Sequence, residues 1–320
     1  MWIVPEREIG ALMNEAMAFD AVEAVFGAMS KGAARNFPVI REPVGGGALY
    51  GFKSGFDEAG GALGLKSGGY WPGNAEKGLA NHQSSIFLFD PETGRLKAVV
   101  GGNLLTALRT AAAQAVSLKH LAREDARVLG MVGAGHQAPF QLRAAAKQRG
   151  FEKVVAWNRT PEKLDGLRAA AEEVGLPFEV VSLEALGAEA DVIVTIVSSF
   201  EAVLGADMVR PGTHIAAMGT DTVGKQELDP ALVGRATVFT DELAQSKTLG
   251  EAQHAVAEGL MAAEDLVEIG RVINGEHPGR TSADEVTVFD GTGVGLQDLA
   301  VAGAVLAQAI ENGIAADVDL

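Results

Sequence analysis

The spacing of apolar residues changes twice along the chain. Residues 9–29 carry apolar side chains at helical spacing and predict one amphipathic helix. Residues 37–101 instead contain short apolar runs separated by glycines and polar turns, which predicts an antiparallel or mixed sheet with a hairpin turn at residues 90–94. An alanine-rich helix is expected over residues 103–122, with Asn103 as its N-cap.

From residue 126 the pattern becomes an alternation of apolar strands and helices. The expected strands are RVLGMVG, KVVAWN, PFEVV, DVIVTIV, THIAAMG and ATVFT. Helices are expected over residues 137–148, 161–174, 182–186 and 229–233. Continuous apolar strands in this order predict a parallel sheet that helices cover on both faces. A further strand, VTVFDG, precedes a helix from about residue 295 to residue 312, which could return to the first domain.

This order predicts an α/β fold with two domains. Residues 120–294 form the Rossmann dinucleotide-binding domain. Residues 1–119 and 295–320 form a discontinuous α+β domain. Because no long linker separates the two, the boundary rests on topology alone.

Composition excludes several classes of protein. The 320 residues are 48% hydrophobic and 21% charged, as in globular proteins. No apolar run is long enough for a membrane span, and the first residues resemble neither a secretory signal nor a transit peptide, so we expect a cytoplasmic protein. The formal charge of −16 argues against nucleic acid as a partner. With no cysteine and no cluster of histidines at ligand spacing, we expect no metal site.

The sharpest motif is the glycine-rich turn after the strand that starts at residue 128. Gly133 permits the tight turn, Gly135 lets the backbone approach a pyrophosphate, and Ala138 permits close packing of helix on strand. His136 and Gln137 lie where the helix begins, so its N-terminal N–H groups face the phosphates. An ordinary βα turn is the alternative, but the order of strand, turn, helix and strand favours dinucleotide binding.

The type of dinucleotide depends on the end of the next strand. Asn158 stands where an acidic residue usually binds the ribose hydroxyls of NAD, and Arg159 could pair with the 2′-phosphate of NADP(H). Arg159 could equally be a solvated surface residue. Thr195 and Ser198 end a later strand at the same edge and are expected to border the nucleotide, although their hydroxyls could instead cap a turn.

Several short motifs occur in an order that resembles the ornithine cyclodeaminase/mu-crystallin family over nearly the whole chain. They are Leu65-Lys66, Tyr70-Trp71-Pro72-Gly73-Asn74, residues 105–112 (LTALRTAA), residues 132–135 (VGAG), residues 219–228 (GTDTVGKQEL), residues 289–293 (FDGTG) and residues 297–300 (QDLA). Members of this family exchange a hydride between a nicotinamide and the carbon of an amine/imine pair. The resemblance therefore implies an oxidoreductase that acts on a small amino or imino acid.

The resemblance also implies roles for particular residues. Arg41 and Arg109 would hold the substrate carboxylate, for which a guanidinium fork is suited. Lys66 and Asp221 would be the catalytic residues. Each residue also has an alternative role. Arg41 could pair with Glu42, and Arg109 could form an ion pair on a helix surface. Lys66 could protect an edge strand from aggregation, and Asp221 could form a turn or cap a helix.

Three further residues of the family motifs are expected near the cofactor. Gly219 and Thr220 precede Asp221 at the carboxyl edge of the parallel sheet, where ligands bind in such folds. Asp290 follows the last strand of that sheet and is expected to help frame the nicotinamide.

The substrate class follows from a polar run in the first domain. His82 and Ser84, in the sequence NHQSS, could bind a second carboxylate, although they could also be surface loop residues. This run and GGYWPGN make the chain most similar to the iminosuccinate reductases of the family, which favours NAD(H) over NADP(H) and reduction of iminosuccinate to L-aspartate. The alternatives are an ornithine cyclodeaminase, a ketimine reductase, an alanine dehydrogenase and a non-catalytic NAD(P)H-dependent binding protein. The resemblance further implies that the discontinuous domain binds substrate and forms a homodimer.

Overall fold

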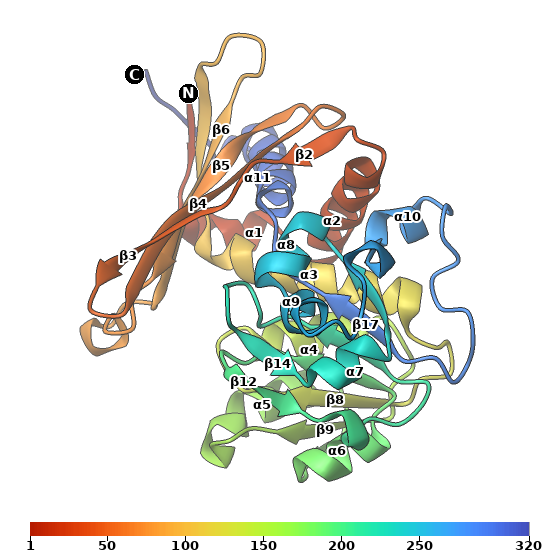
Figure 1. Cartoon of the computed structure of the whole chain (residues 1–320). Helices are drawn as coiled ribbons and strands as arrows, with labels where there is room; N and C mark the ends of the chain where they lie inside the picture. The colour runs from red at the N-terminus through yellow and green to blue at the C-terminus, as the bar shows by residue number, and fades with distance from the viewer. Residues whose placement is uncertain (320) are drawn as a thin grey trace. The chain divides into compact units, whose positions relative to one another are not determined.

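The computed structural model describes residues 1–319 and divides into two compact units (Figure 1). The first unit comprises residues 1–109 and 294–320, and the second comprises residues 110–293. Each unit contains its own large sheet.

The first unit is built on a mixed sheet. Its strands are β1 (Trp2–Val4), β2 (Ala34–Asn36), β3 (Ile40–Gly45), β4 (Ala48–Asp57), β5 (Ala62–Tyr70), β6 (His82–Phe89), β7 (Leu96–Gly101) and β18 (Ala316–Asp317). Their order is β18-β1-β7-β6-β5-β4-β2, and β3 pairs with β4. Apart from the parallel pair β1–β7, neighbouring strands are antiparallel, as the short apolar runs predicted. The two ends of the chain are adjacent, since β1 pairs with β18.

The helices of the first unit differ from the prediction at one point. Two helices, α1 (Ile9–Leu12) and α2 (Glu15–Ser30), replace the single predicted helix over residues 9–29. The break occurs because Met13 is extended and Asn14 caps α2 by accepting a hydrogen bond from the backbone N–H of Met17. The C-terminal helix α11 (Gly295–Glu311) packs on α2 and across β4 and β5, so it covers the centre of the sheet (Figure 1).

The helix α3 (Asn103–Leu121) begins in the first unit and continues into the second. The prediction that Asn103 caps this helix is wrong. Glu6 accepts hydrogen bonds from the backbone N–H groups of Asn103 and Leu104, at 3.0 and 2.8 Å. The side-chain oxygen of Asn103 is therefore available to accept from the backbone N–H of Ser84, at 2.8 Å.

The second unit contains an entirely parallel sheet. Its strands are β8 (Val128–Val132), β9 (Lys153–Trp157), β10 (Phe178–Val180), β11 (Val192–Thr195), β13 (His214–Ala217), β15 (Thr237–Thr240), β16 (Val267–Glu268) and β17 (Thr287–Asp290). Their order is β10-β9-β8-β11-β13-β17-β15-β16. The central strands β11, β13 and β17 are buried along their whole length, which explains their continuous apolar sequences.

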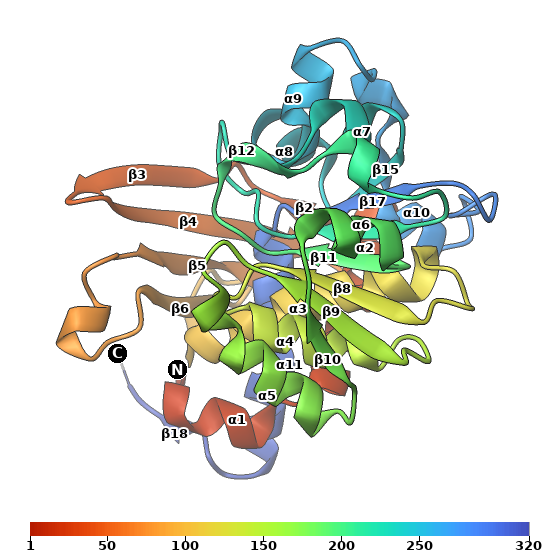
Figure 2. The ribbon, with the colours of Figure 1, turned by 90° about the horizontal axis from the view of Figure 1, so that it is seen from below.

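Helices connect and cover these strands. They are α4 (Ala138–Ala146), α5 (Asp165–Glu173), α6 (Leu183–Glu189), α7 (Pro230–Gly234), α8 (Leu243–Leu249), α9 (Ala252–Ala257) and α10 (Ile269–Ile273). In Figure 2 α4 and α5 lie on one side of β8, β9 and β10, and α6, which contacts β8 and β9, lies on the other. A small parallel pair, β12 (Phe200–Leu204) and β14 (Gln226–Leu228), lies outside the large sheet. The predicted α/β fold with a Rossmann-type sheet and a separate mixed sheet is thus confirmed.

None of the helices in residues 1–319 is both long and apolar enough to cross a membrane.

Candidate functional site

Four of the predicted substrate-binding and catalytic residues of the first unit lie on one face of its sheet. In the strand register, Arg41, Gly51, Gly68 and Ser84 form one row across β3, β4, β5 and β6. Lys66 lies two residues before Gly68, and His82 two residues before Ser84, so both share this face. Since Gly51 and Gly68 carry no side chain, nothing projects from the strands between Arg41 and Ser84.

Lys66 and the fifth predicted residue, Arg109, meet at a buried carboxylate. Asp298, near the start of α11, is completely buried and lies 2.9 Å from the Lys66 ammonium. The Nε of Arg109 donates a hydrogen bond to the same carboxylate at 2.9 Å, and its Nη1 donates to Gln297 at 2.9 Å. Lys66 also donates to Thr106 at 3.3 Å. One aspartate therefore fixes the Lys66 ammonium and the plane of the Arg109 guanidinium.

Burial and charge change the protonation of this group. Desolvation lowers the pKa of Lys66 to about 8, although Asp298 opposes the change. Burial alone would raise the pKa of Asp298, but the charges of Arg109 and Lys66 hold it below its usual value. The charge of Arg41 also lowers the pKa of Lys66, and the charge of Lys53 lowers the pKa of Asp298. Three basic side chains thus act on the carboxylate of Asp298 and a fourth acts on Lys66, in a chain whose formal charge is −16.

The NHQSS run belongs to this group of residues. His82 and Ser84 are in β6 and are half-buried, so they are not part of an exposed loop. The hydroxyl of Ser84 lies 3.5 Å from that of Thr106, which contacts Lys66. Ser84, Thr106, Lys66 and Asp298 therefore form a connected polar series.

The glycine-rich turn of the second unit has the predicted backbone. Gly133 has a φ of 109°, and an added Cβ would lie 2.7 Å from the backbone oxygen of Ile196. A Cβ on Gly135 would meet nothing within 4 Å, so a ligand can approach the backbone there. Ala138 is fully buried at the start of α4. His136 is exposed beside the turn.

The N-terminus of α4 is suited to an anionic ligand. Its N-cap, Gln137, makes no side-chain capping hydrogen bond. Among residues 1–319, no group hydrogen-bonds the buried side-chain oxygen of Gln137. A dinucleotide could use both the open helix end and this unpaired acceptor.

The other predicted cofactor residues differ in their accessibility. Asn158 donates to the backbone oxygen of Thr160 at 2.7 Å, whereas Arg159 and Ser198 are exposed. Thr195 is completely buried, and its hydroxyl donates to Glu227 at 2.7 Å. Arg159 and Ser198 are therefore accessible to a ligand, whereas the buried hydroxyl of Thr195 is already bonded to Glu227.

The segment from Gly219 to Asp221 lies after β13, at the carboxyl edge of the sheet. The backbone N–H of Gly219 donates to Glu227, and the hydroxyl of Thr220 donates to Glu251. Asp221 is partly exposed and pairs with Lys225 at 2.9 Å. Its carboxylate is thus the accessible acidic group of this segment.

Asp290 lies at the same edge of the sheet but is completely buried. Its carboxylate accepts hydrogen bonds from the backbone N–H groups of Glu251 and Ala252 and from the hydroxyl of Ser246. Burial raises the pKa of Asp290 to about 7. Its contacts connect the end of β17 to the start of α9.

Three acidic residues that organise these sites, Asp298, Glu227 and Glu251, were not predicted as site residues, although the first two lie within the family motifs. Asp298 could have been found, because a charge within the apolar helix sequence GLQDLAVAGAV requires a buried cation. Glu227 and Glu251 carry no comparable signal, since their partners are backbone N–H groups and hydroxyls of other segments.

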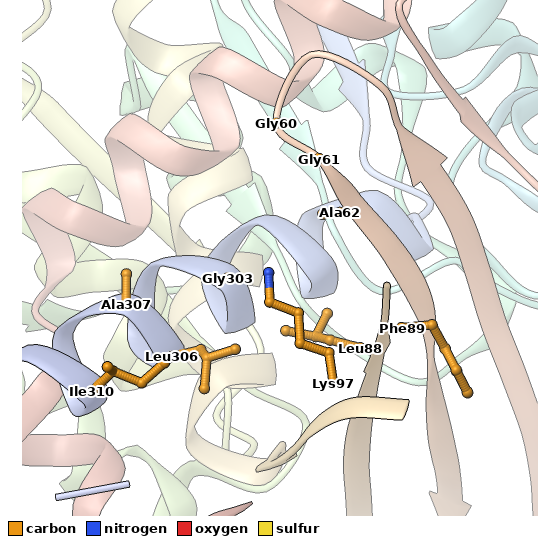
Figure 3. Close-up of a pocket in the computed structure, with 10 residues that line it drawn as sticks. All are labelled: Gly60, Gly61, Ala62, Leu88, Phe89, Lys97, Gly303, Leu306, Ala307 and Ile310. Atoms are coloured by element: carbon orange, nitrogen blue, oxygen red, sulfur yellow. The ribbon is translucent and has the colours of Figure 1, made fainter. Parts of the chain in front are cut away.

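A separate cavity of about 280 Å³ lies in the first unit (Figure 3). Gly60, Gly61, Ala62, Leu88, Phe89, Lys97, Gly303, Leu306, Ala307 and Ile310 line it. No predicted site residue is among them. Within the described residues, no three His, Asp or Glu side chains are grouped in a way that could hold a metal ion.

Known proteins resemble this chain over its full length. An iminosuccinate reductase of Paracoccus denitrificans is 60% identical over 321 residues, covering 100% of both chains. The crystal structure of that enzyme in complex with NAD⁺ superimposes with a TM-score of 0.96 and covers 100% of this chain and 99% of the other.

Two less similar matches are alanine dehydrogenases. An alanine dehydrogenase of Archaeoglobus fulgidus is 35% identical over 313 residues, covering 98% of this chain and 96% of its own. An archaeal alanine dehydrogenase dimer with bound NAD is 34% identical, has a TM-score of 0.94 and is covered to 99%. The family model for the ornithine cyclodeaminase/mu-crystallin family matches residues 3–313. As the order of its motifs predicted, the chain belongs to the ornithine cyclodeaminase/mu-crystallin family.

Proposed function

We propose that this protein is an NAD-dependent oxidoreductase that reduces iminosuccinate to L-aspartate. The observation that carries the proposal is the pairing of Lys66 and Arg109 with the buried carboxylate of Asp298, with the charge of Lys53 also acting on Asp298 and that of Arg41 acting on Lys66. An excess of positive charge in an acidic protein favours a substrate with two carboxylates. The 60% identity to an iminosuccinate reductase over the full chain supports the same substrate.

The residues of the second unit fit a nicotinamide dinucleotide. The backbone at Gly133 and Gly135, the open N-terminus of α4 and the unpaired oxygen of Gln137 would hold the pyrophosphate and ribose. When bound, the reduced dinucleotide supplies a hydride for the imine carbon.

The residues of the first unit would bind and protonate the substrate. The bonds of Arg109 to Asp298 and Gln297 fix its guanidinium, whose other N–H groups can bind a carboxylate. Arg41 would add a second cation. His82 and Ser84 would bind the distal carboxylate. Lys66, with a pKa of about 8, is mostly protonated at neutral pH and would donate a proton to the imine nitrogen.

In the second unit, Asp221 would accept a hydrogen bond from the substrate nitrogen. The reaction adds a hydride to the imine carbon and a proton to its nitrogen, so that C=N becomes CH–NH. No covalent intermediate with the protein is needed, and orientation and charge carry the rate.

We favour NAD(H) over NADP(H) for this chain. The crystal structure of the 60% identical relative is a complex with NAD⁺, and an archaeal alanine dehydrogenase also binds NAD. Arg159 is exposed and does not by itself require a 2′-phosphate. We further propose a homodimer, since that alanine dehydrogenase is a dimer. A cytoplasmic location, expected from the sequence, stays part of the proposal.

The proposal is tested by following nicotinamide absorbance with oxaloacetate and ammonium, which form iminosuccinate in solution. NADH and NADPH are compared in parallel, with pyruvate, glyoxylate and L-ornithine as other substrates. We expect fast oxidation of NADH with oxaloacetate and ammonium only. A preference for pyruvate would refute the assigned substrate. L-Ornithine cannot oxidise NADH, so release of ammonia from it with NAD⁺ is measured instead, and fast release would also refute the assignment. Binding of NADH without turnover would indicate a binding protein.

A further inference from the structure

The loop that carries Asp221 is exposed only at its tip. It connects β13 to β14 over residues 218–225; Met218 is buried, whereas Val223 at the tip is 71% exposed. Beyond Met218, hydrogen bonds at the ends and in the middle of the loop help to fix its conformation.

Glu227 closes this loop at its base. Its side chain is completely buried, and one carboxylate oxygen accepts from the backbone N–H of Val197 at 2.6 Å. The other accepts from the backbone N–H of Gly219 at 2.8 Å and from the hydroxyl of Thr195 at 2.7 Å. A single side chain thus connects the end of the loop to its start and to the end of β11.

The approach is so close that no larger residue fits at position 219. An added Cβ on Gly219 would lie 2.1 Å from the backbone oxygen of Val197 and 2.4 Å from the Glu227 carboxylate. The Glu227 carboxylate can therefore reach the backbone at position 219 only because that residue is a glycine.

Gln253 holds the middle of the loop. Its side-chain oxygen accepts from the backbone N–H of Gly224 at 2.8 Å, and its amide donates to the backbone oxygen of Gly250 at 2.8 Å. Glu251, two residues earlier, accepts from Thr220 and from the backbone N–H groups of Glu227 and Leu228. The start of α9 is thus a fixed base for the loop.

A buried carboxylate is a costly way to stabilise a loop. Burial raises the pKa of Glu227 and of Glu251 above the usual range, which shows that both carboxylates lose hydration. What a carboxylate offers at position 227 is two oxygens that accept three hydrogen bonds together; a glutamine can offer only one such oxygen.

We propose that Glu227 and Gln253 are positioning residues for the reaction, which act by holding the loop so that the carboxylate of Asp221 is presented in one orientation. This inference rests on the proposed function, in which Asp221 accepts a hydrogen bond from the substrate nitrogen. Neither residue contacts the reacting atoms. Their effect on the rate must therefore pass through Asp221.

A double-mutant cycle tests this dependence. Glu227→Gln and Gln253→Ala are each made in the native chain and in Asp221→Asn, with Glu201→Gln, an exposed glutamate on β12, as control. We expect each single change to lower kcat about tenfold or more, because a displaced carboxylate no longer meets the nitrogen. The KM for NADH should change less than kcat, and the control should retain full activity. In the Asp221→Asn background, neither change should lower kcat further.

Three results would overturn the proposal or its basis. If the losses multiply with that of Asp221→Asn, both residues act on the fold and not through Asp221. If kcat is unchanged in both variants, the loop does not need these contacts. If Asp221→Asn alone leaves kcat unchanged, the role of Asp221 in the proposed function is wrong, a failure distinct from the first two. Should Glu227→Gln fail to fold, the partly buried Gln253→Ala carries the same cycle.

Discussion

The substitution Asp298→Asn removes one buried negative charge and retains the size and one acceptor oxygen of the side chain. Asp298 lies 2.9 Å from both the Lys66 ammonium and the Nε of Arg109, and it is completely buried. Its charge raises the pKa of Lys66, against the larger effect of desolvation. Removing the charge must therefore lower that pKa further.

The size of the effect follows from the short distance. Two unit charges about 3 Å apart interact by about 5 kcal/mol at an effective dielectric constant of about 20. Because one pKa unit corresponds to about 1.4 kcal/mol, full loss of this interaction would lower the pKa of Lys66 by about 4 units. Asparagine keeps a dipole and water can enter, so we expect a fall of at least about 1 unit. The pKa of Lys66 should then move from about 8 towards about 7 or below.

The assay is the pH dependence of kcat/KM between about pH 6 and pH 9. If protonated Lys66 is the acid, activity falls as the pH rises through its pKa, and a lower pKa moves this fall to lower pH. The control is Glu311→Gln, which removes one charge from the exposed end of the same helix and should not move the profile. A folded Asp298→Asn variant with an unchanged profile would refute the electrostatic link between Asp298 and Lys66.

Three other substitutions test separate parts of the account. His82→Ala should raise the KM for iminosuccinate about tenfold, because one hydrogen bond to the distal carboxylate is lost. The slow reaction with pyruvate and ammonium should change little, and equal effects on both substrates in steady-state assays would contradict the role of His82. Gly133→Ala should weaken NADH binding at least about tenfold, since φ is 109° and the new Cβ would meet the backbone oxygen of Ile196. Binding is measured by calorimetry, and an unchanged Kd would mean that the pyrophosphate binds elsewhere. Arg159→Leu should leave kcat/KM for NADH unchanged and lower any activity with NADPH about tenfold; a loss with NADH would show that this exposed arginine binds NAD.

The sequence predicted those features that depend on a repeating pattern or a short motif. Alternating apolar strands predicted the parallel sheet, and the glycine motif predicted the tight turn at Gly133, because both features reflect local backbone geometry. That a dinucleotide binds at this turn stays a prediction. Lys66 and Arg109 were predicted as parts of motifs. Their meeting at Asp298 was not, since 189 residues separate Arg109 from Asp298 in the chain.

Other features depend on contacts that no local pattern contains. The break between α1 and α2 is set by an Asn14 cap within an otherwise continuous apolar pattern. The helix start at Asn103 is capped by Glu6, which is 97 residues away. Glu227 could be read as an ordinary strand residue, yet its carboxylate organises three segments of the second unit. Buried acceptors of backbone N–H groups are set by tertiary structure, which a single sequence does not display.

The most direct test of hydride transfer to an imine carbon uses NADH labelled with deuterium at C4, in both stereochemical forms, with oxaloacetate and excess ammonium. The product is identified by mass spectrometry and NMR. We predict that one of the two forms transfers its deuterium to C2 of L-aspartate, with one label in each product molecule. Deuterium in malate would mean that the protein reduces the ketone, and unlabelled aspartate from both forms would mean that the C4 hydride does not reach the imine; either result would contradict the proposed reaction.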